Sequence, residues 1–151
     1  MARLTGDEAS EGARVALGLD SSVPAFAWPV DRLDAPGGSY YLVLFGPLEA
    51  SVAVAAVDAA TGDVLTSARL SGSVPHLPLS KQEAAERAGL PTESVTRLVW
   101  QPSRQSRSLL YPLWEVRRGS RIAYVDRHGS RWPRLDPAGQ GGNNGGNDAS
   151  R

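Results

Sequence analysis

Residues 4–13, LTGDEASEGA, decide the expected fold because residues 79–88, LSKQEAAERA, repeat their pattern. Leu, Glu, Ala, Glu and Ala stand at the same positions in both segments. In each copy a Thr or Ser is followed three residues later by Glu. This is the capping-box pattern, in which hydroxyl and carboxylate satisfy free N–H groups at the start of a helix. Two helices are therefore predicted, over residues 5–18 and 80–89.

The similarity continues past both predicted helices, in the same order and with loops of slightly different length. Four matches in one order are the sign of an internal repeat, which bears on the whole fold and not on one element. The further matches pair SVPAFAWP (22–29) with SVTRLVWQP (94–102), SYYLVLFG (39–46) with SLLYPLWEV (108–116), and AVAAVDAATGDVL (53–65) with IAYVDRHGSRW (122–132).

These matched segments are apolar runs bounded by turn residues, the pattern of strands and hairpins. Gly62 and Gly129 supply the positive φ that tight hairpin turns require. The predicted fold class is α+β: two tandem units, each a helix plus an antiparallel sheet, related by a pseudo-two-fold axis. The first unit with its linker is predicted over 1–78 and the second over 79–135. Strands are expected at 24–30, 39–46, 51–58, 63–70, 95–101, 109–117, 121–126 and 130–135.

A helix with an EA…A face, a strand and the hairpin VDAATGDVL (57–65) resemble the PepSY-type unit of the cystatin-like group. The likeness covers residues 4–70 and again 79–135, although VDRHGSRW (125–132) lacks the Thr-Gly of the first hairpin. The second half is also similar to uncharacterised actinobacterial proteins. The resemblance implies a PepSY/cystatin-like, non-catalytic module that makes inhibitory or chaperone-like contacts with proteases or belongs to envelope proteins.

Composition excludes several classes of function. The absence of Cys rules out disulfides, thiolate catalysis and Cys-ligated metal centres. No run approaches the roughly 18 apolar residues of a membrane helix. The N-terminal segment carries acids where a signal peptide needs a continuous apolar core. A cytoplasmic protein without membrane contact is therefore expected.

Catalytic and metal chemistry find little support. The two histidines are His76, in a Pro-flanked linker, and His128, in a predicted turn. Neither is followed or preceded by the ligand spacing of a metal site or by a nucleophile motif. Glu115 and Asp126 could form a carboxylate pair, but each has arginine neighbours, which makes cross-strand ion pairs the simpler account. The prediction is therefore a protein that is not an enzyme, with no cofactor and no metal.

Charge is distributed unevenly along the chain. Residues 1–79 hold nine acids and four bases, whereas residues 80–151 hold seven acids and twelve bases. Such asymmetry can mark a partner surface. Where the first unit carries Asp31 and Asp34, the loop of the second carries Arg104 and Arg107. The predicted function is binding of a protein or peptide with an acidic or extended segment. The predicted contact residues are Arg104, Arg107, Arg117, Arg121, Trp100 and Trp114.

Three alternatives stay open. The Gly/Asn-rich segment 136–151 has the composition of a flexible tail, so the chain could be an accessory or carrier protein that presents this tail to a modifying enzyme. Arginines interleaved with aromatic residues are also typical of nucleic-acid binding. A small molecule could occupy a cavity between helix and sheet. The aromatic residues that would line it in the first unit are Phe26, Trp28, Tyr41 and Phe45.

Overall fold

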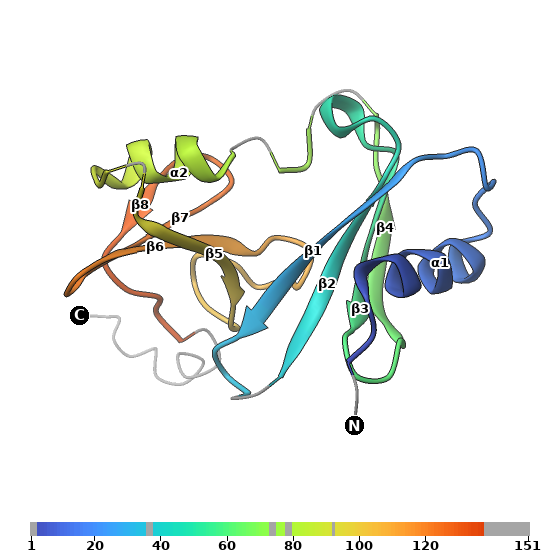
Figure 1. Cartoon of the computed structure of the whole chain (residues 1–151), viewed down its shortest axis with the longest axis horizontal. Coiled ribbons are helices and arrows are strands. Elements are labelled where there is room, and N and C mark those ends of the chain that lie inside the picture. The colour runs from blue at the N-terminus through green and yellow to red at the C-terminus, as the bar shows by residue number, and fades with distance from the viewer. Residues whose placement is uncertain (1–2, 36–37, 73–74, 78–79, 92, 138–151) are drawn as a thin grey trace, which may run out of the picture.

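The computed structural model describes residues 3–35, 38–72, 75–77, 80–91 and 93–137 of the 151-residue chain. Within these residues, two α-helices and eight strands follow one another (Figure 1). The first half contains α1 (Gly6–Leu17), β1 (Ala25–Arg32), β2 (Ser39–Phe45), a short 3-10 helix (Leu48–Ala50), β3 (Ala53–Asp58) and β4 (Val64–Arg69). The second half contains α2 (Lys81–Ala88), β5 (Val95–Trp100), β6 (Leu113–Arg118), β7 (Arg121–Val125) and β8 (Arg131–Trp132).

Both predicted capping boxes are confirmed. Thr5 and Ser80 each accept a hydrogen bond from the backbone N–H of the glutamate three residues on, and each glutamate carboxylate accepts one in return. Gly89 ends α2 in the left-handed conformation at φ 72°, which glycine adopts at no steric cost. The two helices therefore begin and end within a residue of their predicted bounds.

All eight strands belong to one sheet, in the order β4-β3-β2-β1-β5-β6-β7-β8. Neighbours pair antiparallel except β1 and β5, which pair in parallel through Val30, Asp31 and Arg32. The predicted fold class is therefore wrong: the chain forms one mixed, predominantly β sheet, and not two pseudo-symmetric units that each carry a sheet. The physical reason is the edge of β1, whose unpaired N–H and C=O groups find their partners on β5.

The two helices cover different parts of this sheet. Helix α1 packs on β1 to β4, and α2 packs on β5 to β7 (Figure 1). Small residues let each helix approach closely, since Ala9 and Ala13 of α1 and Ala84, Ala85 and Ala88 of α2 are buried. One core cluster contains α2 residues together with residues from both halves of the sheet. Burial of this shared cluster stabilises the halves together.

The predicted strand 109–117 begins four residues later than expected, at Leu113. Pro112 has no N–H to donate to a sheet ladder, and the N–H of Tyr111 donates to the carbonyl of Ser108 in a turn. Residues 101–112 therefore form a long loop between β5 and β6. The hairpins at Gly62 and Gly129 form as predicted, with φ of 82° and 84°.

Candidate functional site

The loop 101–112 is held by two serines that point inward. The Ser106 hydroxyl accepts a hydrogen bond from Nε1 of Trp100 at 3.3 Å and lies 2.6 Å from the carbonyl oxygen of Tyr111, to which it can donate. The backbone N–H of Ser106 donates to Oγ of Ser103. Ser103 and Ser106 are both buried. Because buried polar groups need partners, these contacts fix the path of the loop.

Two further side chains tie the end of this loop to the rest of the fold. The Tyr40 hydroxyl donates to the carbonyl of Leu109 at 2.7 Å, and burial raises the pKa of this phenol. Nε2 of His76 donates to the carbonyl of Leu110, which requires the tautomer with a proton on Nε2. Burial lowers the pKa of His76 and so favours the neutral ring. The linker before α2 and strand β2 thus both anchor the loop.

With the serines facing inward, Arg104 and Arg107 face outward and are exposed. Together with Arg127 and His128 from the turn after β7, they line a hollow of about 360 Å³. Among the described residues, neither the Arg104 nor the Arg107 guanidinium forms a hydrogen bond or an ion pair. The loop therefore presents two guanidinium groups whose donors are open to a ligand. We call this set of residues the basic hollow.

Arg127 is placed by an aromatic stack. Its guanidinium carbon lies 4.4 Å from the centre of the Tyr111 ring, a favourable cation–π distance. The His76 ring stacks against Tyr111 at 4.9 Å between centres. The loop 101–112, the linker that carries His76 and the turn that carries Arg127 therefore all meet at the Tyr111 ring. This contact holds Arg127, the third arginine of the basic hollow, in position.

Asp126 also lines the basic hollow, and its carboxylate is occupied by hydrogen bonds within its own turn. Asp126 accepts hydrogen bonds from the N–H groups of His128 and Ser130, at 2.9 and 3.0 Å, and from Nε1 of Trp132 at 2.9 Å. Its oxygens therefore do not pair with the three arginines. Three arginines and this one carboxylate line the basic hollow, so positive charge is in excess there and the hollow is a candidate anion-binding site.

The chain end that the structure describes lies against the same loop. The N–H of Arg104 donates to the carbonyl of Asp136 at 2.9 Å, and Ser103 forms an isolated bridge with Pro137. A hydrogen bond from Gln105 is the main cause of a lowered pKa of Asp136. The first two residues of the predicted tail 136–151 are thus part of the fold, and the rest of that tail lies outside the described residues.

Four predicted contact residues lie away from the basic hollow. Trp100 and Trp114 are 5% and 7% exposed and belong to the core, so neither presents its ring to a partner. Arg117 pairs with Glu115, its Nη2 atom 3.5 Å from the carboxylate. Arg121 lines a second hollow, beside the end of α2. The structure therefore brings together Arg104 and Arg107 from the predicted set, and adds Arg127.

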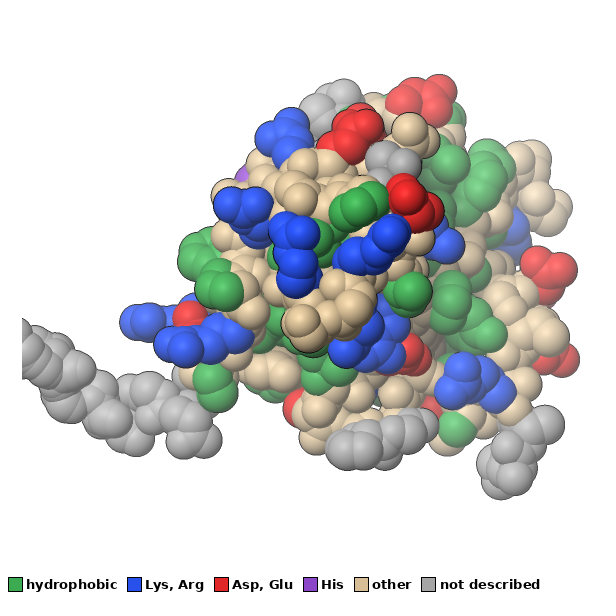
Figure 2. All heavy atoms as spheres, turned by 60° about the vertical axis from the view of Figure 1, so that its left-hand side comes forward, with side chains coloured by type: hydrophobic (Ala, Val, Ile, Leu, Met, Phe, Trp, Pro, Cys, Tyr) green, Lys and Arg blue, Asp and Glu red, His purple; other side chains and the backbone are tan. Residues whose placement is uncertain are grey.

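The positive charge is part of a wider pattern. Lys and Arg side chains outnumber acidic ones on the face in view when the α2 side of the molecule is turned forward (Figure 2).

Among the described residues, no three His, Cys, Asp or Glu side chains are grouped as metal ligands would be. Within the same ranges, no helix combines the length and apolar character needed to cross a membrane.

Comparison with known proteins identifies no family. No family model matches the sequence, and no curated protein matches it. The structure is similar to the crystal structure of a candidate lipoprotein from Clostridium difficile 630, with a TM-score of 0.36 and 14% sequence identity. The similarity covers 88% of this chain and 92% of that one. At this level the likeness supports no statement about fold or function, and the PepSY resemblance stays a prediction.

Proposed function

We propose that this protein is a non-catalytic binding module whose basic hollow takes an acidic segment of a protein or peptide. The observation that carries the proposal is the pair of outward guanidinium groups, Arg104 and Arg107, which form no hydrogen bond or ion pair among the described residues. Guanidinium groups bind carboxylates through paired, charge-assisted hydrogen bonds. A chain with several carboxylates matches a hollow with three arginines.

Rigidity of the loop favours the same function. Binding costs less when the recognition groups are already ordered. Buried or partly buried hydrogen bonds from Tyr40, His76 and Ser106 hold the loop that carries Arg104 and Arg107. The partner therefore meets a preformed surface on which few contacts have to be ordered.

The test is fluorescence anisotropy of a labelled hexaglutamate peptide at several salt concentrations. We expect binding that weakens with salt, and a loss of about tenfold or more in affinity for R104E/R107E. K81E/R118E is the matched control, because it changes net charge equally at two exposed positions outside the basic hollow. Equal losses for both variants, or no loss for R104E/R107E, would contradict the proposal.

A second candidate is the accessory or carrier role, favoured by the bridge between Pro137 and Ser103. An enzyme bound at the basic hollow would stand beside the point where residues 138–151 begin. Mass spectrometry of protein from its native source tests this role: a mass shift on residues 138–151 is expected, and an unmodified segment under all growth conditions argues against it.

Three further statements belong to this proposal. We propose a module that is not an enzyme and needs no cofactor, because arginine side chains bind anions through fixed positive charge and do not lose a proton in proteins. The proposal places the protein in the cytoplasm without membrane contact, and it favours a protein or peptide partner over nucleic acid. The PepSY resemblance of the sequence is in line with a binding role.

A further inference from the structure

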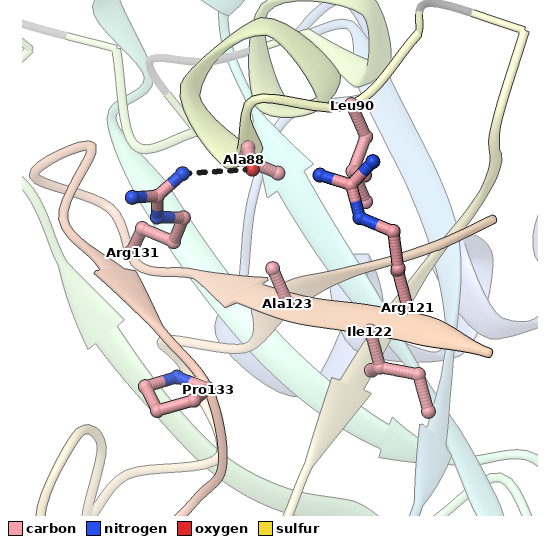
Figure 3. A pocket seen from close by; sticks show the side chains of 7 residues that line it. All are labelled: Ala88, Leu90, Arg121, Ile122, Ala123, Arg131 and Pro133. Carbon is pink, nitrogen blue, oxygen red and sulfur yellow. Dashed lines mark hydrogen bonds between the residues drawn. The ribbon is translucent and has the colours of Figure 1, made fainter.

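A second hollow, of about 420 Å³, lies between the end of α2 and strands β7 and β8. Its lining joins two arginines, Arg121 and Arg131, to apolar side chains (Figure 3). The apolar members are Ala88, Leu90, Ile122, Ala123 and Pro133. This is a different set of residues from the basic hollow, and the inference below does not rest on the proposed function.

The two guanidinium groups are placed by the helix end. Nη1 of Arg131 donates to the carbonyl of Ala88 at 3.1 Å, and Nη2 of Arg121 lies 3.5 Å from the carbonyl of Gly89. The negative end of the helix dipole favours cations there. Figure 3 shows the two groups on either side of Ala88, above Ala123. Each arginine keeps several N–H donors beyond the one it uses.

Gly89 makes this arrangement possible. A Cβ at this position would lie 2.9 Å from Nη1 of Arg131. Its φ of 72° also belongs to the left-handed region that favours glycine. The glycine therefore both ends α2 and leaves room for the Arg131 guanidinium against the last turn.

The chemistry of the lining selects one class of ligand. Two guanidinium groups take an anion, and a carboxylate matches the paired donors of an arginine. Ala88, Leu90 and Ala123 are buried and apolar, so the floor next to the arginines suits an apolar body. The hollow is within the size range of small-ligand sites. An inorganic anion would leave the apolar floor uncovered.

From this geometry we infer a binding site for an apolar carboxylate, held between Arg121 and Arg131 with its apolar part on Leu90 and Ala123. Two sources share this chemistry: the C-terminal residue of a peptide, and a free aliphatic acid. In both, the carboxylate sits at one end of an apolar group.

The experiment follows backbone amide chemical shifts of the full chain during titration with N-acetyl-leucine, N-acetyl-leucinamide, hexanoate and inorganic phosphate. We expect N-acetyl-leucine to shift the amides of Leu90, Ile122 and Ala123 with an affinity of about millimolar order, and the uncharged amide to leave them unchanged. Stronger binding of N-acetyl-leucine than of hexanoate identifies a peptide C-terminus as the source. Equal or stronger binding of hexanoate identifies a free acid.

Variants complete the test. R121Q/R131Q is expected to weaken the carboxylate by about tenfold or more, whereas K81Q/R118Q changes net charge equally and leaves the affinity unchanged. Since Arg131 also caps α2, R121Q alone is measured beside it, with a thermal melt of each variant. The inference is overturned by unchanged binding in R121Q/R131Q, by phosphate binding as tightly as N-acetyl-leucine, or by the absence of shifts at these amides.

Discussion

Replacement of Arg97 by alanine tests how the two halves of the sheet are joined. The parallel seam between β1 and β5 contains three registered pairs. Arg97 of β5 crosses it: Nη1 lies 2.8 Å from the carboxylate of Asp31 on β1, and Nε lies 2.8 Å from that of Glu115 on β6. Hydrogen bonding to Glu115 is the main cause of the raised pKa of Arg97. One side chain thus ties together three neighbouring strands.

The size of the effect follows from burial. The Glu115 side chain is 4% exposed, and without Arg97 it keeps the longer contact to Arg117 and a hydrogen-bonding interaction with the Tyr124 side chain. Removing one partner of a fully buried pair costs about 3–5 kcal/mol. Since the Arg97 side chain is 42% exposed, we expect R97A to lower the free energy of unfolding by about 2 kcal/mol.

Urea unfolding followed by circular dichroism measures this change. R118A is the control, because the Arg118–Glu93 pair is exposed on both sides at 3.6 Å, and we expect a loss within about 0.5 kcal/mol. In R97M/E115L both charges are replaced by apolar groups, so most of the stability should return. The reasoning is refuted if R97A lowers the free energy of unfolding no more than R118A does. It is also refuted if the loss in R97M/E115L equals the sum of the losses in R97M and E115L.

Two further predictions concern the loop. S106A removes the acceptor for Trp100 and the donor to Tyr111. We therefore expect the free energy of unfolding to fall by about 2 kcal/mol and hexaglutamate to bind more weakly. Thermal melts and anisotropy measure the two effects, and wild-type values for both would contradict the prediction. His76 has a folded-state pKa below its ordinary 6.5. The unfolded chain therefore binds more protons below this pH, and stability should fall from about pH 6.5 to about pH 5, above the carboxylate range. H76Q should flatten this slope, and an equal slope in both proteins would contradict it.

Local sequence patterns predicted the helices and turns, because each of these elements depends on residues that are close together in the sequence. A hydroxyl and a glutamate three residues apart suffice to begin α1 and α2, and glycine in a turn suffices to join β3 to β4. The single sheet could not be predicted in this way. A repeat in the sequence does not state which strand edges pair, and the parallel seam depends on three pairs between residues 68 positions apart, such as Val30 and Leu98.

The candidate site was predictable in part. The inverted charge between Asp31 and Arg104 pointed to the loop that lines the basic hollow. The part played by Arg127 was missed, because its position over Tyr111 depends on tertiary packing. The alternation of inward serines and outward arginines in SRQSR (103–107) is a signal that could have separated Arg104 and Arg107 from the buried tryptophans. Arg131 beside Gly89 follows from no local pattern.

Charge reversal at the basic hollow tests the central claim most directly. Affinities for labelled hexaglutamate and hexalysine are measured with the wild-type protein and with R104E/R107E/R127E, at one salt concentration. The account predicts that the wild type prefers hexaglutamate and that the variant prefers hexalysine. The three side chains are exposed, so the unfolding free energy should fall by only about 1 kcal/mol, from the lost cation–π contact of Arg127 with Tyr111. A folded variant that keeps the wild-type preference would contradict it.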